Sequence, residues 1–337
     1  MKQWKKAVVL AAPMTLAMSF GAFAGQWEEA DVTWKYCQDD GSYAADTWQW
    51  IDGNGDGTAE CYYFDENGLL ALNTVVDNWI VNAQGQWTLG GNVQRLDLGA
   101  TAEEISAIYT AANLKAAALT DFDADVDAVM KFTIDEESLD MLLDMNMKMQ
   151  GAYSGNMKIL YDMAIKAEGE TMTMTMFYED GYMYTEMDGM KMKMPMDMDE
   201  MMAQTMAISS SLSFASDEMY GMTNLKLYHN GNANVISYDL DAAQLNAAVN
   251  EIFGLMGTDF SDMGYEYQIN SASGTIHINE DGYADKERVS MDMSMTLLGM
   301  TMNMDIDMDV AIKNPGQPVY VTLPSTEGYA DLMAVTE

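Results

Sequence analysis

The chain has 337 residues, of which 49% are hydrophobic and 20% are charged, a balance that supports a packed core and excludes a wholly disordered chain. Its 53 acidic residues outnumber the 16 lysines and arginines, which gives a formal net charge of −37 at pH 7. Such a charge disfavours nucleic acids and anionic lipid surfaces as partners and favours cationic ones.

Residues 1–24 have the pattern of a secretory signal peptide. Three lysines precede an apolar run, and the segment ends with Ala22-Phe23-Ala24. These features correspond to the charged region, the hydrophobic region and the small-residue cleavage site of such a peptide. The apolar run is short for a transmembrane helix, and no later segment is long and uncharged enough to be one. We therefore expect a secreted protein without a membrane span.

Residues 25–91 contain a repeated hairpin pattern. The segments at 34–44 and 61–71 align so that Gly41 and Gly68 correspond, and a shorter third copy at 79–87 contains Gly85. Each copy has an aromatic strand, an acidic or amide turn residue, a glycine and a second short strand, which is typical of a β-hairpin. Because a lone hairpin cannot bury its aromatic face, we predict that the hairpins stack on one another.

The segment WQWIDGNGDGTAECYYFDENG at 48–68 resembles the cell-wall-binding repeats of Gram-positive surface proteins, of the choline-binding and glucan-binding type. In that family, tryptophan and tyrosine rings bind choline headgroups by cation–π attraction or stack on sugar rings. The resemblance assigns ligand binding here to Trp34, Tyr36, Trp48, Trp50, Tyr62 and Tyr63. It implies a choline- or glycan-bearing wall polymer as partner and a cell-wall-associated, extracellular location. The alternative is that these rings form the hairpins' own core.

Asp52, Asn54 and Asp56 have the spacing of the first three ligands of a calcium-binding loop. The position at which such a loop places a bidentate glutamate is Tyr63, and an acidic, glycine-rich hairpin turn explains the same residues. The sequence leaves both interpretations open, and it assigns no cofactor and no metal ligand.

The two cysteines, Cys37 and Cys61, both lie in this region. An even number of cysteines in an exported chain indicates a disulfide, so we predict a bond between them. The alternative is two free thiols.

A linker is predicted at 92–100, and the capping box from Thr101 to Glu104 begins a helix that runs to about Leu119. Apolar and polar residues then alternate along most of residues 101–337, as half-buried antiparallel strands require. Asp-Gly and Asn-Gly turns separate the strands. Two further helices are predicted, one over residues 199–212 and one from Asp241 towards Met256.

These patterns predict a mainly β protein with a few helices, in which N-terminal hairpin repeats precede a large curved antiparallel sheet covered by α-helices. The units YEDGYMYTEMDGMKMKMP at 178–195 and INEDGYA at 278–284 resemble the half-barrel fold of bacterial lipoprotein carriers, the LolA/LppX-like group. The resemblance implies that the concave face holds acyl chains or another hydrophobic small molecule or lipid.

The 35 methionines allow three interpretations. They are adaptable core residues, or they line a flexible concavity for a hydrophobic ligand, or their thioethers bind copper(I). The sequence alone leaves these three alternatives open, because strand periodicity by itself produces the M-x-M spacing.

No motif of a hydrolase, a nucleotide-binding protein or a zinc protease is present, and the two histidines occur in a turn and a strand. We therefore expect a non-catalytic surface protein that attaches to the cell wall through its hairpins and holds a hydrophobic ligand in its half-barrel. The alternatives are a carrier whose hairpins are purely structural and a copper(I)-binding protein.

Overall fold

The computed structural model describes residues 25–331 apart from 31–32, 39, 135–136, 153, 155, 199, 202–218, 256–264 and 298–299. The predicted signal peptide, most of the helix predicted over 199–212 and the end of the helix predicted near Met256 lie outside the described residues. The chain forms two compact units, one of Met1–Ala107 with Leu225–Ser237 and one of Ile108–Asn224 with Tyr238–Glu337. The hairpin segment Leu225–Ser237 therefore belongs with the N-terminal repeats.

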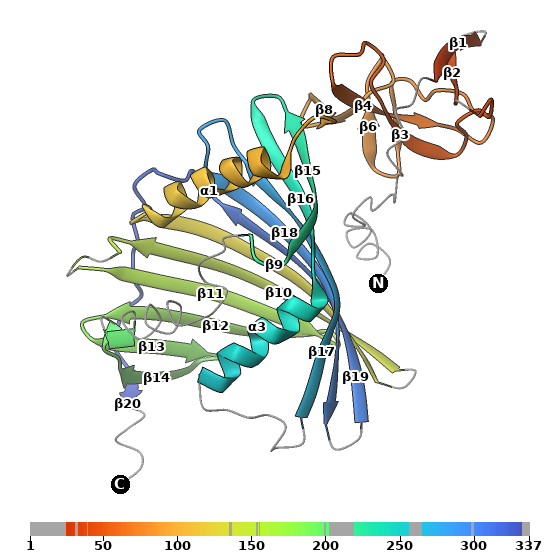
Figure 1. The fold of residues 1–337 in the computed structure, drawn as a ribbon. Coiled ribbons are helices and arrows are strands. Elements are labelled where there is room, and N and C mark those ends of the chain that lie inside the picture. The colour runs from red at the N-terminus through yellow and green to blue at the C-terminus, as the bar shows by residue number, and fades with distance from the viewer. Residues whose placement is uncertain are drawn as a thin grey trace. The chain divides into compact units, whose positions relative to one another are not determined.

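The first unit consists of short antiparallel strands (Figure 1). Their bounds are β1 (Gln26–Ala30), β2 (Thr33–Cys37), β3 (Thr47–Ile51), β4 (Thr58–Phe64), β5 (Thr74–Val76), β6 (Trp79–Val81), β7 (Trp87–Leu89) and β8 (Asn92–Asp97), with parts of β15 (Met222–Asn230) and β16 (Ala233–Leu240). The pairs β1–β2 and β3–β4 are hairpins, and β5 to β8 form a meander. Strand β8 also pairs with β4 and β15.

The turn expected from the repeat is present in all three copies. The amides of Gly41, Gly68 and Gly85 donate to the carbonyl oxygen three residues earlier at 2.9, 2.8 and 3.0 Å. In the second and third copies, a side-chain oxygen of Asp65 or Asn82 accepts two further backbone amides. Each glycine has a φ between 74° and 82°, a conformation that a side chain disfavours. The predicted hairpin repeats are therefore confirmed.

The aromatic side chains of the first unit pack on both faces of the β3–β4 hairpin. One cluster of buried residues comprises Tyr36, Ala44, Ile51, Phe64 and Leu70. A second comprises Trp48, Cys61 and Val81, with Trp50, Tyr63, Val76, Trp79 and Trp87 against it. Successive side chains of a strand point to opposite faces, so β4 contributes Phe64 to the first cluster and Cys61 to the second.

The predicted disulfide between Cys37 and Cys61 is wrong, because both cysteines are free thiols. Strand β2 places Tyr36 in the first cluster, whereas Cys61 lies in the second, on the opposite face of the β3–β4 hairpin. The Cys37 Sγ instead donates to the carbonyl oxygen of Gln38 at 3.6 Å. Burial raises the pKa of the fully buried Cys61 thiol well above its usual range.

The second unit contains a long antiparallel sheet. Its strands are β9 (Phe122–Ile134), β10 (Glu137–Gln150), β11 (Lys158–Ala167), β12 (Glu170–Glu179), β13 (Tyr182–Met187), β14 (Met190–Pro195), β17 (Tyr265–Ile278), β18 (Ala284–Leu297), β19 (Met300–Ile312) and β20 (Ala330–Asp331). Pairing follows the order β17, β18, β19, β9, β10, β11, β12, β13, β14, and β20 runs parallel to β14.

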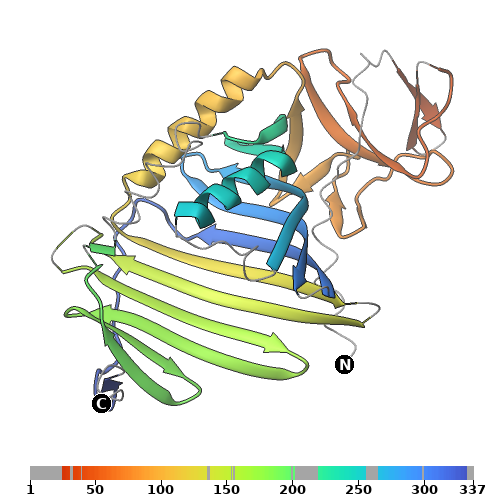
Figure 2. The same ribbon diagram turned by 60° about the horizontal axis from the view of Figure 1, so that its bottom comes forward.

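This sheet is strongly curved, and helix α3 (Ala242–Leu255) lies on its concave side (Figures 1 and 2). The Asn246 side chain attaches α3 to β17, because its amide donates to the carbonyl oxygen of Ile269 at 2.9 Å and its oxygen accepts the Ile269 amide at 2.9 Å. Helix α1 (Ala102–Ala117) begins with the predicted capping box, in which the Glu104 amide donates to Thr101 Oγ1 at 3.2 Å. The predicted mainly β fold with a curved, half-barrel sheet is confirmed.

The other face of the sheet carries most of the charged side chains of the strands, together with the buried, stacked rings of Phe177 and Tyr184. Its charges are unevenly matched. Lys313 donates to Asp125 at 2.7 Å, and this interaction, with help from Asn146, holds the pKa of Asp125 below its usual range. Asp127 lies two residues further along β9, in register with Asp144 on β10 and Asp309 on β19. Partial desolvation, followed by the negative charges of these neighbours, raises the pKa of Asp127.

We predict opposite stability effects for Asp127→Asn and Asp125→Asn. The raised pKa of Asp127 means that its charged form destabilises the fold above pH 4, so Asp127→Asn should raise the free energy of unfolding at pH 7 by about 0.5 kcal/mol. The lowered pKa of Asp125 means that its charge stabilises the fold at neutral pH, so Asp125→Asn should lower it by a similar amount. Urea unfolding at pH 7 and pH 3 checks this. The effect of Asp127→Asn should be almost lost at pH 3, whereas that of Asp125→Asn should shrink and disappear only below the lowered pKa of Asp125. Changes of the same sign at pH 7 would contradict the assignment.

We predict that a maleimide labels one thiol of the native protein and both thiols in denaturant, without a reductant. Cys61 is fully buried and its raised pKa disfavours the reactive thiolate, whereas Cys37 is partly exposed. Mass spectrometry counts the labels, and Cys37→Ser should abolish native labelling. Failure of both thiols to react in denaturant until a reductant is added would restore the disulfide.

Candidate ligand-binding face

The apolar side chains of neighbouring strands form rows across the concave side of the sheet. The register aligns five methionines from five successive strands in one row, Met145, Met163, Met174, Met187 and Met190. The same row continues in the other direction through Val126 on β9 and Val310 on β19. Since side chains directly opposite each other in a sheet lie about 5 Å apart, this row is a continuous apolar surface.

Parallel rows lie on either side of it. Across β18 and β19 the opposed pairs are Met291–Ile306, Met293–Met304 and Met295–Met302. Across β13 and β14 they include Met183–Met194 and Thr185–Met192, while Lys191 and Lys193 point to the other face. We call the surface made by all these rows the methionine face. Alternation predicted this separation of apolar and polar faces, and the register bears it out.

Helix α3 identifies the methionine face as the concave one. The side chain of Tyr267 points to this face, because Tyr267 is in register with Met295. Its hydroxyl donates to the carbonyl oxygen of Asn246 in α3 at 3.4 Å. The helix therefore lies on the same side of the sheet as the methionines.

The methionines of this face are not buried, although smaller and branched residues of β9 and β17 on the same face are, such as Ala124, Ala128 and Ile276. Met198 is the only buried methionine among the described residues, and it lies outside the strands. Met172, Met190 and Met194 are 38%, 57% and 39% exposed, and the other described methionines of strands β9 to β14 are partly exposed. A filled core would bury these side chains more completely, so their exposure disfavours the first of the three interpretations of the methionines.

One carboxylate interrupts the apolar surface. Glu287 on β18 is in register with Ile276 on β17 and Val310 on β19, so its side chain belongs to the methionine face. The hydroxyl of Tyr238, at the end of β16, donates to Glu287 Oε1 at 3.0 Å. Tyr238 is buried, and desolvation followed by the negative charge of Glu287 raises its pKa strongly, so its hydroxyl remains a donor.

The ring of Tyr238 reaches this position because residue 274 is a glycine. A Cβ atom on Gly274 would lie 2.4 Å from the Tyr238 hydroxyl oxygen and 2.8 Å from the carbonyl oxygen of Arg288. Gly274 is in register with Val289, which places the missing side chain on the methionine face. The glycine thus makes room for the tyrosine that contacts Glu287.

The structure does not bring together the six aromatic residues assigned to ligand binding in the first unit. Tyr36 is buried in the first cluster, and Tyr62 packs against it. Trp48 is buried in the second cluster, where Trp50 and Tyr63 pack against it on the opposite face of the hairpin. Trp34 is 44% exposed.

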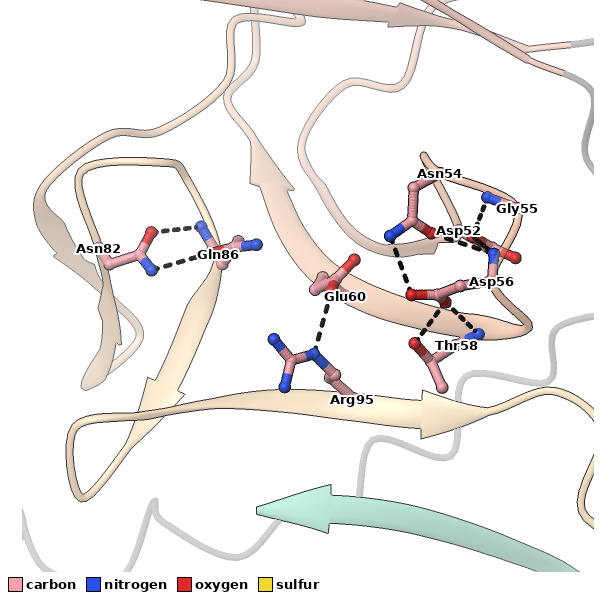
Figure 3. A network of polar contacts seen from close by, with 9 residues as sticks. All are labelled: Asp52, Asn54, Gly55, Asp56, Thr58, Glu60, Asn82, Gln86 and Arg95. Atoms are coloured by element: carbon pink, nitrogen blue, oxygen red, sulfur yellow. Dashed lines mark hydrogen bonds and ion pairs between the residues drawn. The ribbon is translucent and has the colours of Figure 1, made fainter. Parts of the chain in front are cut away.

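The acidic loop at Asp52 satisfies its carboxylates with its own backbone (Figure 3). Asp52 Oδ1 accepts the amide of Gly55 at 2.7 Å, and Asp56 Oδ1 accepts the amide and hydroxyl of Thr58 at 2.8 and 2.6 Å. The Asn54 side chain donates to Asp56 at 2.9 Å. Within the described residues, no group of three or more histidine, cysteine or acidic side chains is arranged to hold a metal ion. These bonds are those of a hairpin turn.

The sequence analysis missed Glu287, Tyr238 and Gly274. The signal for Glu287 was present, since it occupies the position two residues before Val289 in an alternating apolar series. Tyr238 and Gly274 carried no such signal, because their contact joins segments that are distant in the sequence.

Among proteins with curated functions, none matches the chain in sequence. The crystal structure of LprF from Mycobacterium bovis is 14% identical with a TM-score of 0.34, over 68% of this chain and 100% of that one. The Mycobacterium tuberculosis lipoprotein LppX is 11% identical with a TM-score of 0.31, over 66% of this chain and 100% of that one. Likenesses at these TM-scores say nothing about function.

No helix in the described part of the chain has the length and apolar character needed to cross a membrane.

The model of a family of unknown function, DUF6612, matches residues 102–325, which is more than half of the chain and includes the strands of the methionine face. The chain therefore belongs to the DUF6612 family.

Proposed function

We propose that the second unit binds a hydrophobic small molecule or lipid on its methionine face. The observation that carries this proposal is a continuous apolar surface, in register across nine strands, whose described methionines are only partly buried. Contiguous exposed apolar surface on a soluble unit is typical of a binding site. Covering it contributes about 2.5 kcal/mol for each 100 Å² removed from water, which is enough to hold an acyl chain.

Methionine suits a ligand of variable shape. Its side chain is unbranched and flexible, so a row such as Met163, Met174 and Met187 adapts to different apolar surfaces. On the other face of the same strands, polar residues such as Lys166 and Thr171 are partly or fully exposed to water.

We predict that Met174→Asp lowers the affinity for the neutral fluorescent probe N-phenyl-1-naphthylamine at least tenfold. A carboxylate in the centre of the row would have to be desolvated by the bound probe, which is costly. Because Met174 is partly exposed in the free protein, its replacement should lower the free energy of unfolding by only about 1 kcal/mol. Fluorescence titration and urea unfolding measure the two effects.

The matched control is Thr171→Asp, which adds the same charge to the same strand on the polar face, opposite Lys166. It should leave both probe affinity and stability nearly unchanged. Severe unfolding of Met174→Asp, or equal loss of probe binding in both variants, would mean that the methionine face is packed core and the proposal is wrong.

Retention at the cell wall by the first unit is a second proposal, together with the secreted location that it requires. What supports it is Trp34, which is exposed on a hairpin of the repeat type, as a ring that stacks on a sugar or a choline group must be. The other five aromatic residues are buried or partly buried in the two clusters of the unit.

We predict that Trp34→Ala lowers pull-down by purified Gram-positive cell walls severalfold and leaves the melting temperature unchanged. The ring is exposed, so its removal costs little packing. Trp48→Ala is the comparison, since loss of this buried ring should destabilise the unit whether or not it binds wall polymer. Unchanged pull-down by the Trp34 variant would refute wall retention through this residue.

A further inference from the structure

The row that contains the five methionines passes through Glu287 on β18 before it reaches Ile276 on β17. From β18 the row passes through Val310, Val126 and Met145 and continues to Met190 at the edge strand β14. Glu287 is the only charged residue at an interior paired position of this face within the described strands. This row is therefore apolar apart from one carboxylate, which lies one strand from its β17 end.

Glu287 retains capacity to bind a further group. Its side chain is exposed, and only Oε1 receives the Tyr238 hydroxyl. In the described part of the chain, no lysine or arginine forms an ion pair with it, although Arg288 beside it in sequence pairs with Asp309 on the polar face at 2.6 Å. A buried tyrosine needs an acceptor for its hydroxyl, but a neutral acceptor would meet that need. An unpaired carboxylate is the group that a cation recognises.

The distance along the row limits the length of the ligand. Neighbouring strands lie about 4.8 Å apart, so the three strand spacings from Glu287 on β18 to Met145 on β10 span about 14 Å. An extended dodecyl chain has a comparable length. A ligand held at Glu287 by its polar end would lay such a chain across Val310 and Val126 onto the methionines.

We propose that Glu287, oriented by Tyr238, binds the cationic head of an amphiphile whose alkyl chain lies along the methionine row. This inference rests on the proposed function and adds the chemical class of the ligand to it. The ammonium group donates to the free Oε2 of Glu287, and the hydroxyl of Tyr238 fixes the carboxylate from the other oxygen. The net charge of −37 attracts such a ligand and repels its anionic counterpart.

The experiment measures how dodecylamine, dodecanol and dodecanoate displace N-phenyl-1-naphthylamine from the full-length mature protein at pH 7, below their micelle concentrations. The native protein should bind dodecylamine about tenfold more tightly than dodecanol and dodecanoate more weakly than both. Glu287→Gln should reduce the amine-to-alcohol ratio to about one and leave the affinity for dodecanol unchanged. Tyr238→Phe, which keeps the ring beside Gly274, should reduce the ratio severalfold.

Glu266→Gln is the matched control for overall charge. Glu266 is an exposed residue of β17, in register with Thr296 on the polar face, and its replacement removes the same charge. The ratio should be unchanged in this variant. An unchanged ratio in Glu287→Gln, or an equal fall in both variants, would overturn the inference while dodecanol still binds. Failure of all three dodecyl compounds to displace the probe would instead refute the proposed function.

Discussion

Strict period-two register across nine strands is the constraint on which the second unit depends. Successive side chains of a strand point to opposite faces, so a slip of one residue in any pairing would move a whole set of methionines into water and a set of aspartates onto the apolar face. The long strands β10 and β18, of 14 residues each, keep this register over their paired lengths. The β17–β18 pairing has two register shifts, one at Ile269/Ser271 and one at His277/Ile278. The first occurs where α3 binds the Ile269 backbone, and it leaves Ala272 again facing Met291.

This constraint explains why the strands and the hairpin turns could be predicted from the sequence. Alternation and turn glycines are local signals, and each fixes the face of a side chain or the conformation of one turn. Gly68 and Gly85 therefore indicated hairpins that the structure contains, and M-x-M series indicated strands with one apolar face. The mainly β architecture followed from these signals alone.

The features that could not be predicted are those that depend on which surfaces meet. The sequence places Cys37 and Cys61 in successive copies of a repeat. It does not show that β2 packs on one face of β4 while the Cys61 side chain points to the other face. The contact between Tyr238 and Gly274 has the same origin, since neither residue is unusual in its own strand. The burial of Trp48 and the exposure of Trp34 likewise depend on how the hairpins stack on one another. A repeat pattern predicts that they stack, but it does not show which rings are buried between them.

The distribution of charge joins the fold to the proposed ligand. On the polar face, cations are matched with carboxylates, as Lys313 is with Asp125 and Arg288 with Asp309. These pairs are partly exposed, so each contributes little to stability, but they reduce repulsion within a strongly acidic sheet.

Glu287 lies on the face that has no such cation in the described strands. The low polarity of its neighbours strengthens its interaction with any cation that binds there. A free protein with this arrangement leaves both a carboxylate unpaired and methionines partly exposed. One molecule with a cationic head and an alkyl chain would satisfy both, and its binding would stabilise the folded sheet in proportion to its concentration relative to the dissociation constant.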